Sequence, residues 1–385
     1  MATNKEQNKL NVPHLRFPEF HGEWEEHGLS EYLDFKNGLN PDSKRFGKGI
    51  KFISVMDILN NPVITYDCIR ASVQATDAEM SSFSVENGDI LFQRSSETLE
   101  DVGRANVYID DKVAVFGGFV IRGKKKANYN PLFFRYLLSS PYARKRIIPM
   151  GAGAQHFNIG QEGLSKVLLN FPSIEEQTKI ASLLHLLDER IATQSKLIEK
   201  LESLIKGLRV SLMQIENGNI VHLDEIARIY QPQTISSTEL TEEGFLVYGA
   251  NGIIGKYKQY NHKTEQICIT CRGNTCGMVN YTKPMSWITG NAMVINTDEH
   301  QNKVCKRYLY HYLSAYNFNS IISGSGQPQI VRTPLEQLKV PLPTFLEQKQ
   351  KATFLDKIQG KIEINNKTLN LYLQQKQYLL RQMFI

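Results

Sequence analysis

Apolar residues recur at alternating steps of three and four in two stretches, from Leu184 to Leu212 and from Leu355 to Met383. Each stripe covers about four heptads, and this period is typical of a helix that pairs in a coiled coil. At 1.5 Å per residue, such a stripe is on the order of 40 Å long. The pattern therefore predicts two long helices. Their predicted contact face, the seam, consists of Leu184, Leu187, Ile191, Gln194, Ile198, Leu201, Ile205 and Leu208 in the first helix and of Leu355, Ile358, Ile362, Asn365, Leu369, Tyr372 and Leu379 in the second.

The second stretch repeats the first at a constant shift of 171 residues, and the repeat includes the start of each helix. A proline ends a short apolar run in each copy, and Ser173 or Thr344 follows it. Each hydroxyl residue stands three positions before a glutamate, Glu176 or Glu347. This spacing predicts a capping box, in which side chain and backbone satisfy each other's hydrogen bonds at a helix start. The same box at a fixed repeat distance indicates a duplicated architecture.

Two similar helices, each far in sequence from any other partner, most simply pair with one another. Gln194 and Asn365 occupy the same place in the two stripes, and buried amides at seam positions usually fix the register of a coiled coil. The alternative is that each helix packs only on its own domain, since ordinary amphipathic helices show the same stripe. Lys376 on the second seam leaves the register of the pairing open.

The regions before the two helices have a different pattern. Residues from about 25 to 130 and from about 220 to 305 are rich in Val, Ile, Tyr, Phe and Thr and are punctuated by Gly, Asn and Asp, which is typical of β-rich domains. A glycine-rich loop, at 151–158 or 324–329, precedes the capped helix in each half. We therefore expect an α+β chain with two mixed β-rich domains, each followed by a long helix. The expected division is 1–12 flexible tail, 13–172 first β-rich domain, 173–216 central helical region, 217–343 second β-rich domain and 344–385 C-terminal helical region.

Composition narrows the class of protein. The 385 residues are 41% hydrophobic and 22% charged, which is ordinary for a globular chain of two or more domains. Five cysteines are too few for a disulfide framework and favour reduced thiols and a cytoplasmic location. No window approaches the ~18 apolar residues of a membrane span, and the N-terminus has no apolar signal core. The net charge of +6 is compatible with a polyanionic partner.

The sequence lacks the common signatures of an enzyme. The chain has no Gly-x4-Gly-Lys-Ser/Thr phosphate loop, no dinucleotide fingerprint that opens a helix and no Asn/Asp-Pro-Pro-aromatic element of an amino methyltransferase. Cys268, Cys271 and Cys276, with Cys305 as a fourth ligand, are an alternative interpretation as a zinc site. A strand at 267–270 would send neighbouring side chains to opposite faces, so we expect no metal site. The pattern favours a recognition protein without a cofactor of its own.

Two similar β-rich modules held apart by rigid helices suit a bipartite DNA target, since one turn of B-DNA spans roughly 34–36 Å. Sequence readout needs Arg, Lys, Asn and Gln at groove edges and cations along the phosphates. A solvated surface role is the alternative for each such residue. The candidate DNA-binding residues are Arg94, Ser95, Arg104, Lys124, Lys125 and Lys126 in the first module and Lys256, Tyr257, Arg272, Asn274, Gln327, Gln329 and Arg332 in the second.

Several segments together are specific to one protein family. They are PHLRFPEFHGEWE at 13–25, PSIEEQTKIA at 172–181, VYGANGIIG at 247–255, WITGNA at 287–292 and PTFLEQ at 343–348. On these segments the chain resembles, across nearly its whole length, the specificity subunit of Type I restriction–modification systems. The resemblance implies two target recognition domains joined by two conserved helices that pair as an antiparallel coiled coil.

The resemblance also implies a function and a set of partners. The chain would read both halves of an interrupted sequence in double-stranded DNA while two copies of a DNA adenine methyltransferase subunit dock on it, and a restriction/translocase subunit would join. The chain itself would be non-catalytic, and S-adenosylmethionine, ATP and Mg would be used by those partners. Outer helix positions such as Glu189, Arg190, Lys196 and Glu199 would meet solvent or methyltransferase. No membrane partner is implied.

Two alternatives from other classes stay open. A standalone enzyme, such as a fused methyltransferase–nuclease, would bind S-adenosylmethionine as the purified chain. A coiled-coil scaffold would associate with proteins in a salt-insensitive way and would not bind DNA, whereas phosphate contacts make DNA binding strongly salt-dependent.

Overall fold

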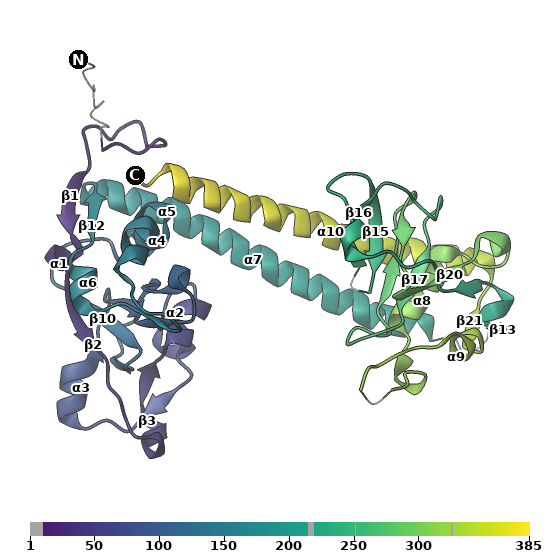
Figure 1. The fold of residues 1–385 in the computed structure, drawn as a ribbon, viewed down its shortest axis with the longest axis horizontal. Coiled ribbons are helices and arrows are strands. Elements are labelled where there is room, and N and C mark those ends of the chain that lie inside the picture. Colours follow the sequence, from purple (N-terminus) through teal and green to yellow (C-terminus); the bar gives the residue numbers. More distant parts are fainter. Residues whose placement is uncertain (1–10, 215–218, 251, 325) are drawn as a thin grey trace. The chain divides into compact units, whose positions relative to one another are not determined.

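The computed structural model describes residues 11–214, 219–250, 252–324 and 326–385 (Figure 1). The chain divides into two compact units. The first unit consists of residues 1–194 and 368–385, and the second of residues 195–367. The predicted flexible tail at 1–12 lies, apart from Asn11 and Val12, outside the described residues, and so does the predicted boundary between positions 216 and 217.

The first unit is built on a four-stranded antiparallel sheet with the order β2-β10-β6-β8. A second sheet, with the order β4-β3-β9-β5, contains one parallel pair, β3 and β9. Two short antiparallel pairs, β1 with β12 and β7 with β11, complete the strands. The strands are β1 (Glu25–Gly28), β2 (Leu33–Asn37), β3 (Phe46–Ile53), β4 (Ser72–Val73), β5 (Ser84–Val85), β6 (Ile90–Gln93), β7 (Ser95–Ser96), β8 (Ala105–Val107), β9 (Ala114–Phe116), β10 (Val120–Lys125), β11 (Phe157–Asn158) and β12 (Leu168–Phe171). The short helices are α1 (Leu29–Tyr32), α2 (Val55–Asn60), α3 (Asp77–Phe83), α4 (Pro131–Ser139), α5 (Pro141–Ile147) and α6 (Gln161–Ser165).

Strand β6 shows how the alternating pattern builds this unit. All four of its residues are buried, because the sheet is covered on both faces. Ile90 and Phe92 enter a core that also contains residues of the long helices, and Leu91 enters a separate core shared with β9 and β10. A period of two along the strand therefore serves two cores at once.

The segment at 13–25 is held against the start of the central helix. Trp24 is buried between Phe133 and Phe384, with edge-to-face ring contacts at 6.1 and 6.3 Å between centroids. Its indole Nε1 donates to the buried carboxylate of Glu176 at 3.3 Å, and Arg16 pairs with the same carboxylate at 2.7 Å. The segment around Trp24 thus contributes to the core of the first unit.

The second unit contains a four-stranded antiparallel sheet with the order β14-β20-β17-β18 and a three-stranded sheet with the order β16-β15-β19. Strands β15 and β19 are parallel, and β13 pairs with β21 antiparallel. The strands are β13 (Asn219–His222), β14 (Arg228–Tyr230), β15 (Phe245–Gly249), β16 (Gly252–Tyr257), β17 (Ile267–Thr270), β18 (Val279–Tyr281), β19 (Trp287–Ile288), β20 (Ala292–Asn296) and β21 (Lys339–Leu342). The short helices are α8 (Lys306–Ala315) and α9 (Arg332–Glu336).

The two units repeat one framework. Each unit contains a four-stranded antiparallel sheet, an inserted sheet with one parallel pair, and a two-stranded pair. The corresponding strands of these sheets follow one another in the same order along the chain. The shift of 171 residues relates β12 to β21, α6 to α9 and α7 (Ile174–Met213) to α10 (Phe345–Gln382). The α+β class with two sheet-rich domains, each followed by a long helix, is therefore confirmed.

The long helices pair antiparallel within each unit. In the first unit the last turns of α10 lie beside the first half of α7, where Lys376 forms an ion pair with Asp188. In the second unit the first turns of α10 lie beside the end of α7, where Lys351 Nζ donates to the carbonyl of Leu212 at 2.7 Å. Every predicted seam residue is buried or half-buried. The ion pair with Asp188 explains how Lys376 is accommodated on the second seam.

The two predicted capping boxes differ in the structure. At α10 the box is complete, because Thr344 N–H donates to Glu347 at 2.9 Å and Glu347 N–H donates to Thr344 Oγ1 at 3.4 Å. At α7 the Glu176 N–H donates to Ser173 Oγ at 3.3 Å, but the Glu176 carboxylate is turned toward Arg16 and Trp24. The expectation of two equal boxes was therefore wrong in the first copy, since tertiary partners take the glutamate there.

Among the described residues, none of the helices combines the length and the hydropathy needed to cross a membrane.

Candidate nucleic-acid interface

In the first unit three segments meet at one end of the central sheet. Arg94, which directly follows β6, donates from its backbone N–H to the Phe119 carbonyl at 2.9 Å. The Arg94 carbonyl accepts from Ile159 N–H at 2.9 Å, and Ser95 stands opposite Asn158 in the pairing of β7 with β11. The loop after β6, the turn before β10 and the glycine-rich loop at 151–158 are thereby joined.

The second unit joins the corresponding segments. Cys271, which directly follows β17, donates from its backbone N–H to the Asn291 carbonyl at 3.1 Å. The Cys271 carbonyl accepts from Ile330 N–H at 3.0 Å, and Arg272 pairs with Gln329 in a β-bridge. Four candidate residues are exposed on these two adjacent loops, namely Arg272, Asn274, Gln327 and Gln329.

The glycine-rich loops have one geometry in both units. Ala152 and Asn158 exchange two backbone hydrogen bonds of 2.9 and 2.8 Å, and Ser323 and Gln329 exchange two of the same lengths. Gly324 has a φ of 92°, and a Cβ there would lie 2.5 Å from the Gln327 carbonyl oxygen. Glycine is required at such a position because L side chains rarely adopt it and the space is filled.

Other candidate residues are placed away from this end of the first unit's sheet. Lys124, Lys125 and Lys126 lie at the end of β10 opposite to Phe119. Lys124 pairs with Glu86 at 3.0 Å, and Lys125 donates to the Tyr129 carbonyl at 3.2 Å with its ammonium 4.8 Å from that ring. Lys126 is exposed. The structure does not bring this basic run together with Arg94 and Ser95.

The remaining candidates are held by local contacts or lie on the inserted sheet. Arg104 pairs with Asp101 at 2.6 Å, and Arg332 pairs with Glu336 on α9 at 2.6 Å. Lys256 is exposed on β16, and the Tyr257 ring packs edge-to-face against Trp287 at 5.0 Å between centroids. Local ion pairs of this exposed kind contribute little to stability and do not prevent a later contact with phosphate.

Sequence reasoning missed an exposed apolar site beside Arg94. A cavity of about 470 Å³ is lined by Phe46, Met56, Ser95 and Phe119, among others. The Phe119 side chain is 69% exposed, although large apolar side chains are usually covered. The available signal was the sequence Gly117-Gly118-Phe119 directly before a strand. A Cβ on Gly117 would lie 2.6 Å from the Phe52 ring, so the backbone is tightly packed under an exposed ring.

The cysteines proposed as alternative zinc ligands are distributed over separate cores. Cys268 in β17 and Cys271, directly after β17, enter two different cores, as the alternation along an extended chain requires. Burial raises the pKa of the Cys268 thiol to about 12, so this thiol stays protonated. No group of three or more His, Cys, Asp or Glu side chains is arranged to hold a metal ion in the part of the chain that the structure describes.

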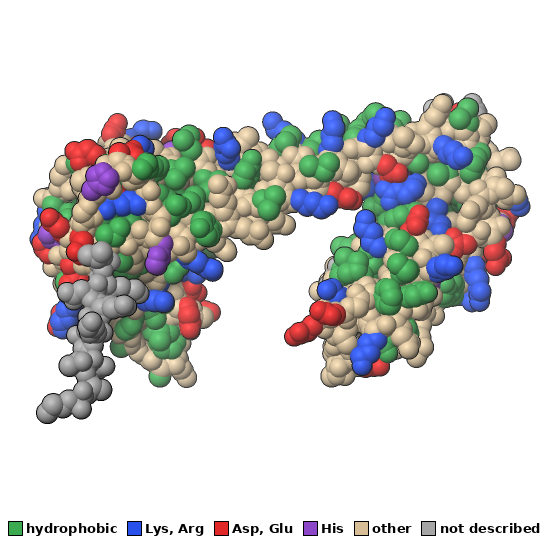
Figure 2. Space-filling view, turned by 90° about the horizontal axis from the view of Figure 1, so that it is seen from above, with side chains coloured by type: hydrophobic (Ala, Val, Ile, Leu, Met, Phe, Trp, Pro, Cys, Tyr) green, Lys and Arg blue, Asp and Glu red, His purple; other side chains and the backbone are tan. Residues whose placement is uncertain are grey.

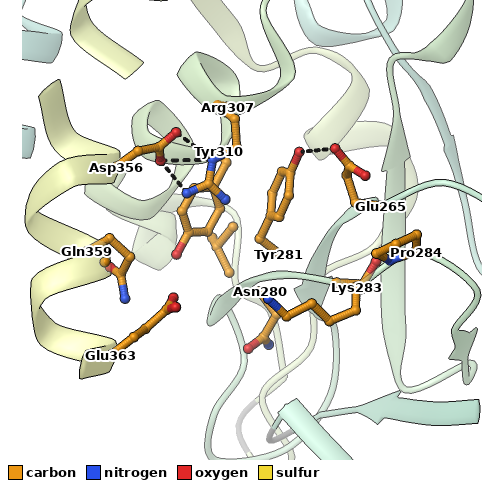
Figure 3. Close-up of a pocket in the computed structure, with 13 residues that line it drawn as sticks. Glu265, Asn280, Tyr281, Lys283, Pro284, Arg307, Tyr310, Asp356, Gln359 and Glu363 are labelled. Atoms are coloured by element: carbon orange, nitrogen blue, oxygen red, sulfur yellow. Dashed lines mark hydrogen bonds and ion pairs between the residues drawn. The ribbon is translucent and has the colours of Figure 1, made fainter. Parts of the chain in front are cut away.

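A second cavity, of about 520 Å³, lies in the second unit between β18, α8 and α10 (Figure 3). Arg307 stands between the rings of Tyr281 and Tyr310, 4.3 and 4.9 Å from their centroids, and forms a bidentate ion pair with Asp356. Next to it, the fully buried His311 contacts Asp356 through Nε2 at 2.8 Å.

His311 is also held from the other long helix. Its Nδ1 accepts from Arg209 Nε at 3.1 Å, so the tautomer with a proton on Nε2 fits both partners. Burial lowers the pKa of His311 and outweighs the opposing effect of Asp356. Burial opposes ionisation of Asp356 too, but hydrogen bonds from His311 and Arg307 prevail and lower its pKa. The network fixes α8 on the helix pair, and its charged groups are already paired.

Comparison with known proteins identifies the family. The model of the Type I restriction modification DNA specificity domain matches residues 21–203 and 216–373. A putative MjaX specificity subunit of a type I restriction enzyme from Methanocaldococcus jannaschii is 24% identical over 401 residues, covering 94% of this chain and 92% of that protein. The EcoprrI specificity subunit of Escherichia coli is 32% identical over 140 residues, covering 35% of this chain and 34% of that protein.

A third curated relative gives a similar partial match. The putative specificity subunit S.HindORF215P of Haemophilus influenzae is 28% identical over 161 residues, covering 40% of this chain. The chain spans 41% of the length of that protein and 34% of the EcoprrI subunit, less than half in both cases.

Solved structures share the fold. The S subunit of a Type I restriction–modification system from M. genitalium superposes with a TM-score of 0.66 at 18% identity, covering 97% of this chain and 99% of that chain. A chain from a study of complex assembly in the type I R-M system superposes with a TM-score of 0.54 at 16% identity, covering 93% and 96%. With the family model matched in both halves, the chain belongs to the family of Type I restriction–modification DNA specificity proteins.

Proposed function

We propose that this Type I specificity subunit reads a two-part target in double-stranded DNA, with one half-site read by each unit. The observation that supports the proposal most directly is the repeat of one surface in both units. In each unit three segments meet: the loop after β6 or β17, the turn before β10 or β20, and the glycine-rich loop. A duplicated reading surface suits two half-sites better than one continuous target.

The chemistry of this surface agrees with DNA recognition. In the second unit, Arg272, Asn274 and Gln329 are exposed side chains of the types that pair with base edges in the major groove. Exposed lysines, such as Lys256 and Lys258 in the second unit and Lys44 and Lys48 in the first, are suited to phosphates. The net charge of +6 has the sign that such a partner requires.

The long helices are proposed to carry the partner subunits. Their outer faces expose large apolar side chains, including Leu186 and Leu204 on α7 and Leu371 and Tyr378 on α10. Figure 2 shows hydrophobic side chains interspersed with Lys and Arg along the helical part of the surface. Large apolar side chains at such positions would be removed from water by a docked protein. We infer that two copies of a DNA adenine methyltransferase subunit dock here, one for each repeat, and that a restriction/translocase subunit joins them.

In this proposal the chain acts without a catalytic step of its own. S-adenosylmethionine, ATP and Mg would be used by the methyltransferase and restriction/translocase subunits, and the complex would act in defence against foreign DNA. Glu189, Arg190, Lys196 and Glu199 are exposed on α7, as a surface that meets solvent or methyltransferase requires.

The proposal is tested by sequencing of modified bases in cells that express this chain with a partner Type I methyltransferase subunit. We expect a methylated two-part motif with a fixed gap, which disappears when this chain is deleted. Methylation that is absent despite a stable and active methyltransferase complex would contradict the proposed function and favour a scaffold.

The spacing role of the helices has its own test. Inserting four residues after Gln194 moves the rest of α7 by about 6 Å and rotates it by more than one turn. We expect the gap of the methylated motif to change or methylation to disappear. A motif with an unchanged gap would contradict the idea that the helices set the spacing.

A further inference from the structure

Matching backbone hydrogen bonds align the two units residue by residue at the reading surface. Gln93 N–H donates to the Arg104 carbonyl at 2.7 Å and its carbonyl accepts from Gly103 at 2.9 Å. Thr270 forms the same two bonds: its N–H donates to the Met278 carbonyl at 2.8 Å, and its carbonyl accepts from Gly277 N–H at 2.9 Å. Gln93 is thus equivalent to Thr270. The next residue along the chain, Arg94, is then equivalent to Cys271, and the residue after it, Ser95, to Arg272.

The turn before the second sheet strand aligns in the same way. The parallel pairs β3/β9 and β15/β19 are each followed by one backbone bond of 3.0 Å, from Gly117 N–H to the Ile53 carbonyl and from Thr289 N–H to the Tyr248 carbonyl. Two residues further on, Phe119 and Asn291 are therefore equivalent. Their carbonyls accept the matching bonds from Arg94 and Cys271.

The glycine-rich loops supply a third equivalent position. Asn158 and Gln329 close their loops with the same pair of backbone bonds, to Ala152 and to Ser323. The following residues, Ile159 and Ile330, are buried and bond to the strand residue of their own unit. The loops are therefore fixed in place while the side chains before them are exposed.

We propose that these three equivalent positions are the specificity-determining positions of the two units, which rests on the proposed function. We call them the reading positions. They are Ser95, Phe119 and Asn158 in the first unit and Arg272, Asn291 and Gln329 in the second. The backbone around them is the same in both units, whereas the side chains differ at all three. All but the half-buried Ser95 are exposed.

The second unit carries three side chains that read bases through hydrogen bonds. Arginine pairs bidentately with guanine, and asparagine and glutamine pair bidentately with adenine. Gly273 N–H donates to the Pro328 carbonyl at 3.0 Å, so the loop that carries Arg272 is tied to the loop that carries Gln329. We expect this half-site to contain a guanine and at least one adenine whose recognition depends on these residues.

The first unit carries a different set. Phe119 borders the cavity of about 470 Å³ that is also lined by Phe46 and Met56, and an apolar surface of this kind fits the 5-methyl group of thymine. Ser95 Oγ donates to Asn158 Oδ1 at 2.5 Å, and the Asn158 amide nitrogen donates to the His156 carbonyl at 3.4 Å, which leaves one amide hydrogen of Asn158 for a contact with a base. Exposed Lys44 and Lys48 stand on either side of Phe46 in sequence and supply charge that complements phosphates. We therefore expect a thymine whose methyl group contributes to recognition.

The inference is tested with the full chain in its methyltransferase complex, using equilibrium binding to duplexes in which each base pair of the methylated motif is replaced in turn. Arg272→Ala and Asn291→Ala should each reduce discrimination at one base pair of the second unit's half-site by about tenfold or more. Lys339→Ala, an exposed lysine on β21, is the matched control and should leave the base preferences unchanged.

The first unit is tested by replacing thymine with uracil, which removes only the methyl group. Binding of the wild-type chain should weaken at one thymine of the half-site, and Phe119→Ala should be insensitive to the same replacement. Lys166→Ala, which removes an exposed lysine paired with Glu162 directly after α6, should retain the wild-type response. Far-ultraviolet circular dichroism and thermal unfolding check that each variant is folded.

The possible outcomes separate the two proposals. If the wild-type complex discriminates no sequence, the proposed function and this inference both fail. If the wild-type complex reads a two-part motif and the folded variants keep every base preference, only the assignment of the reading positions is overturned.

The triple variant R272S/N291F/Q329N, which gives the second unit the first unit's side chains, should shift the half-site of the second unit toward that of the first.

Discussion

The two units have one backbone framework and differ in what is inserted and what is exposed. The inserted sheet of the first unit has four strands and is accompanied by α2 and α3, whereas that of the second has three strands. The parallel pair within each insertion is retained. Since the retained part includes the turns that present Phe119 and Asn291, the framework fixes where a side chain is presented, and the sequence of the turn decides what it can contact.

The contacts that anchor each unit on the helix pair also combine a shared arrangement with different side chains. In the first unit, Tyr136 of α4 donates to Asp188 at 2.9 Å, and Arg135 and Lys376 pair with the same carboxylate. In the second unit, His311 and Arg307 of α8 pair with Asp356. Each anchor places an aspartate of a long helix against cationic and ring-bearing partners, but only the second contains a histidine, whose pKa is lowered by burial.

The largest effect should come from shortening equivalent seam residues in both units. Leu184 and Leu355 are related by the shift of 171 and are both fully buried. Replacing either with alanine should lower the free energy of unfolding by about 2–5 kcal/mol, because a buried cavity remains. Chemical denaturation measures the change, and Leu371→Ala on an exposed outer position should cost less than about 0.5 kcal/mol. Equal losses at the seam and at Leu371 would contradict the assigned packing of the helices.

A smaller effect is expected at the two anchors. Asp188→Asn leaves Arg135 and Lys376 without a counter-charge, and Asp356→Asn does the same to Arg307. We expect a loss of about 1–3 kcal/mol in the free energy of unfolding for each. The loss should be larger at Asp188, whose side chain is 15% exposed, than at Asp356, at 32%. Glu162→Gln, which removes an exposed ion pair with Lys166, is the control, and a loss as large there would refute this ranking.

The sequence predicts the helices and their repeat well because a heptad and a capping spacing are local patterns. It also places Arg272 and Gln329 in separate candidate loops, but only the fold shows that they face each other in a β-bridge. Phe119 was missed because an exposed phenylalanine has the same sequence appearance as a buried one. The role of Glu176 in binding Trp24 could not be inferred either, since the two are brought together by packing between distant segments.

The smallest effect concerns pH and distinguishes the two anchors. Burial lowers the pKa of His311 below its unfolded value, so the unfolded chain binds the proton more readily. The stability that neutral His311 contributes is complete above about pH 6.5 and is lost as the pH falls through its folded pKa. Asp188 and its partners lack such a group, so acidification from neutral pH should weaken the second anchor more than the first.

This difference can be measured by hydrogen exchange on α4 and α8 at a series of pH values, corrected for the intrinsic pH dependence of exchange. Protection of α8 should fall on mild acidification while protection of α4 changes less. His311→Gln should remove most of the dependence in α8. The part that persists should come from His262 in the same unit, whose pKa burial also lowers. If α8 in the His311→Gln chain keeps the wild-type dependence in full, His311 is not the titrating group, and the two anchors respond alike to protons despite their different side chains.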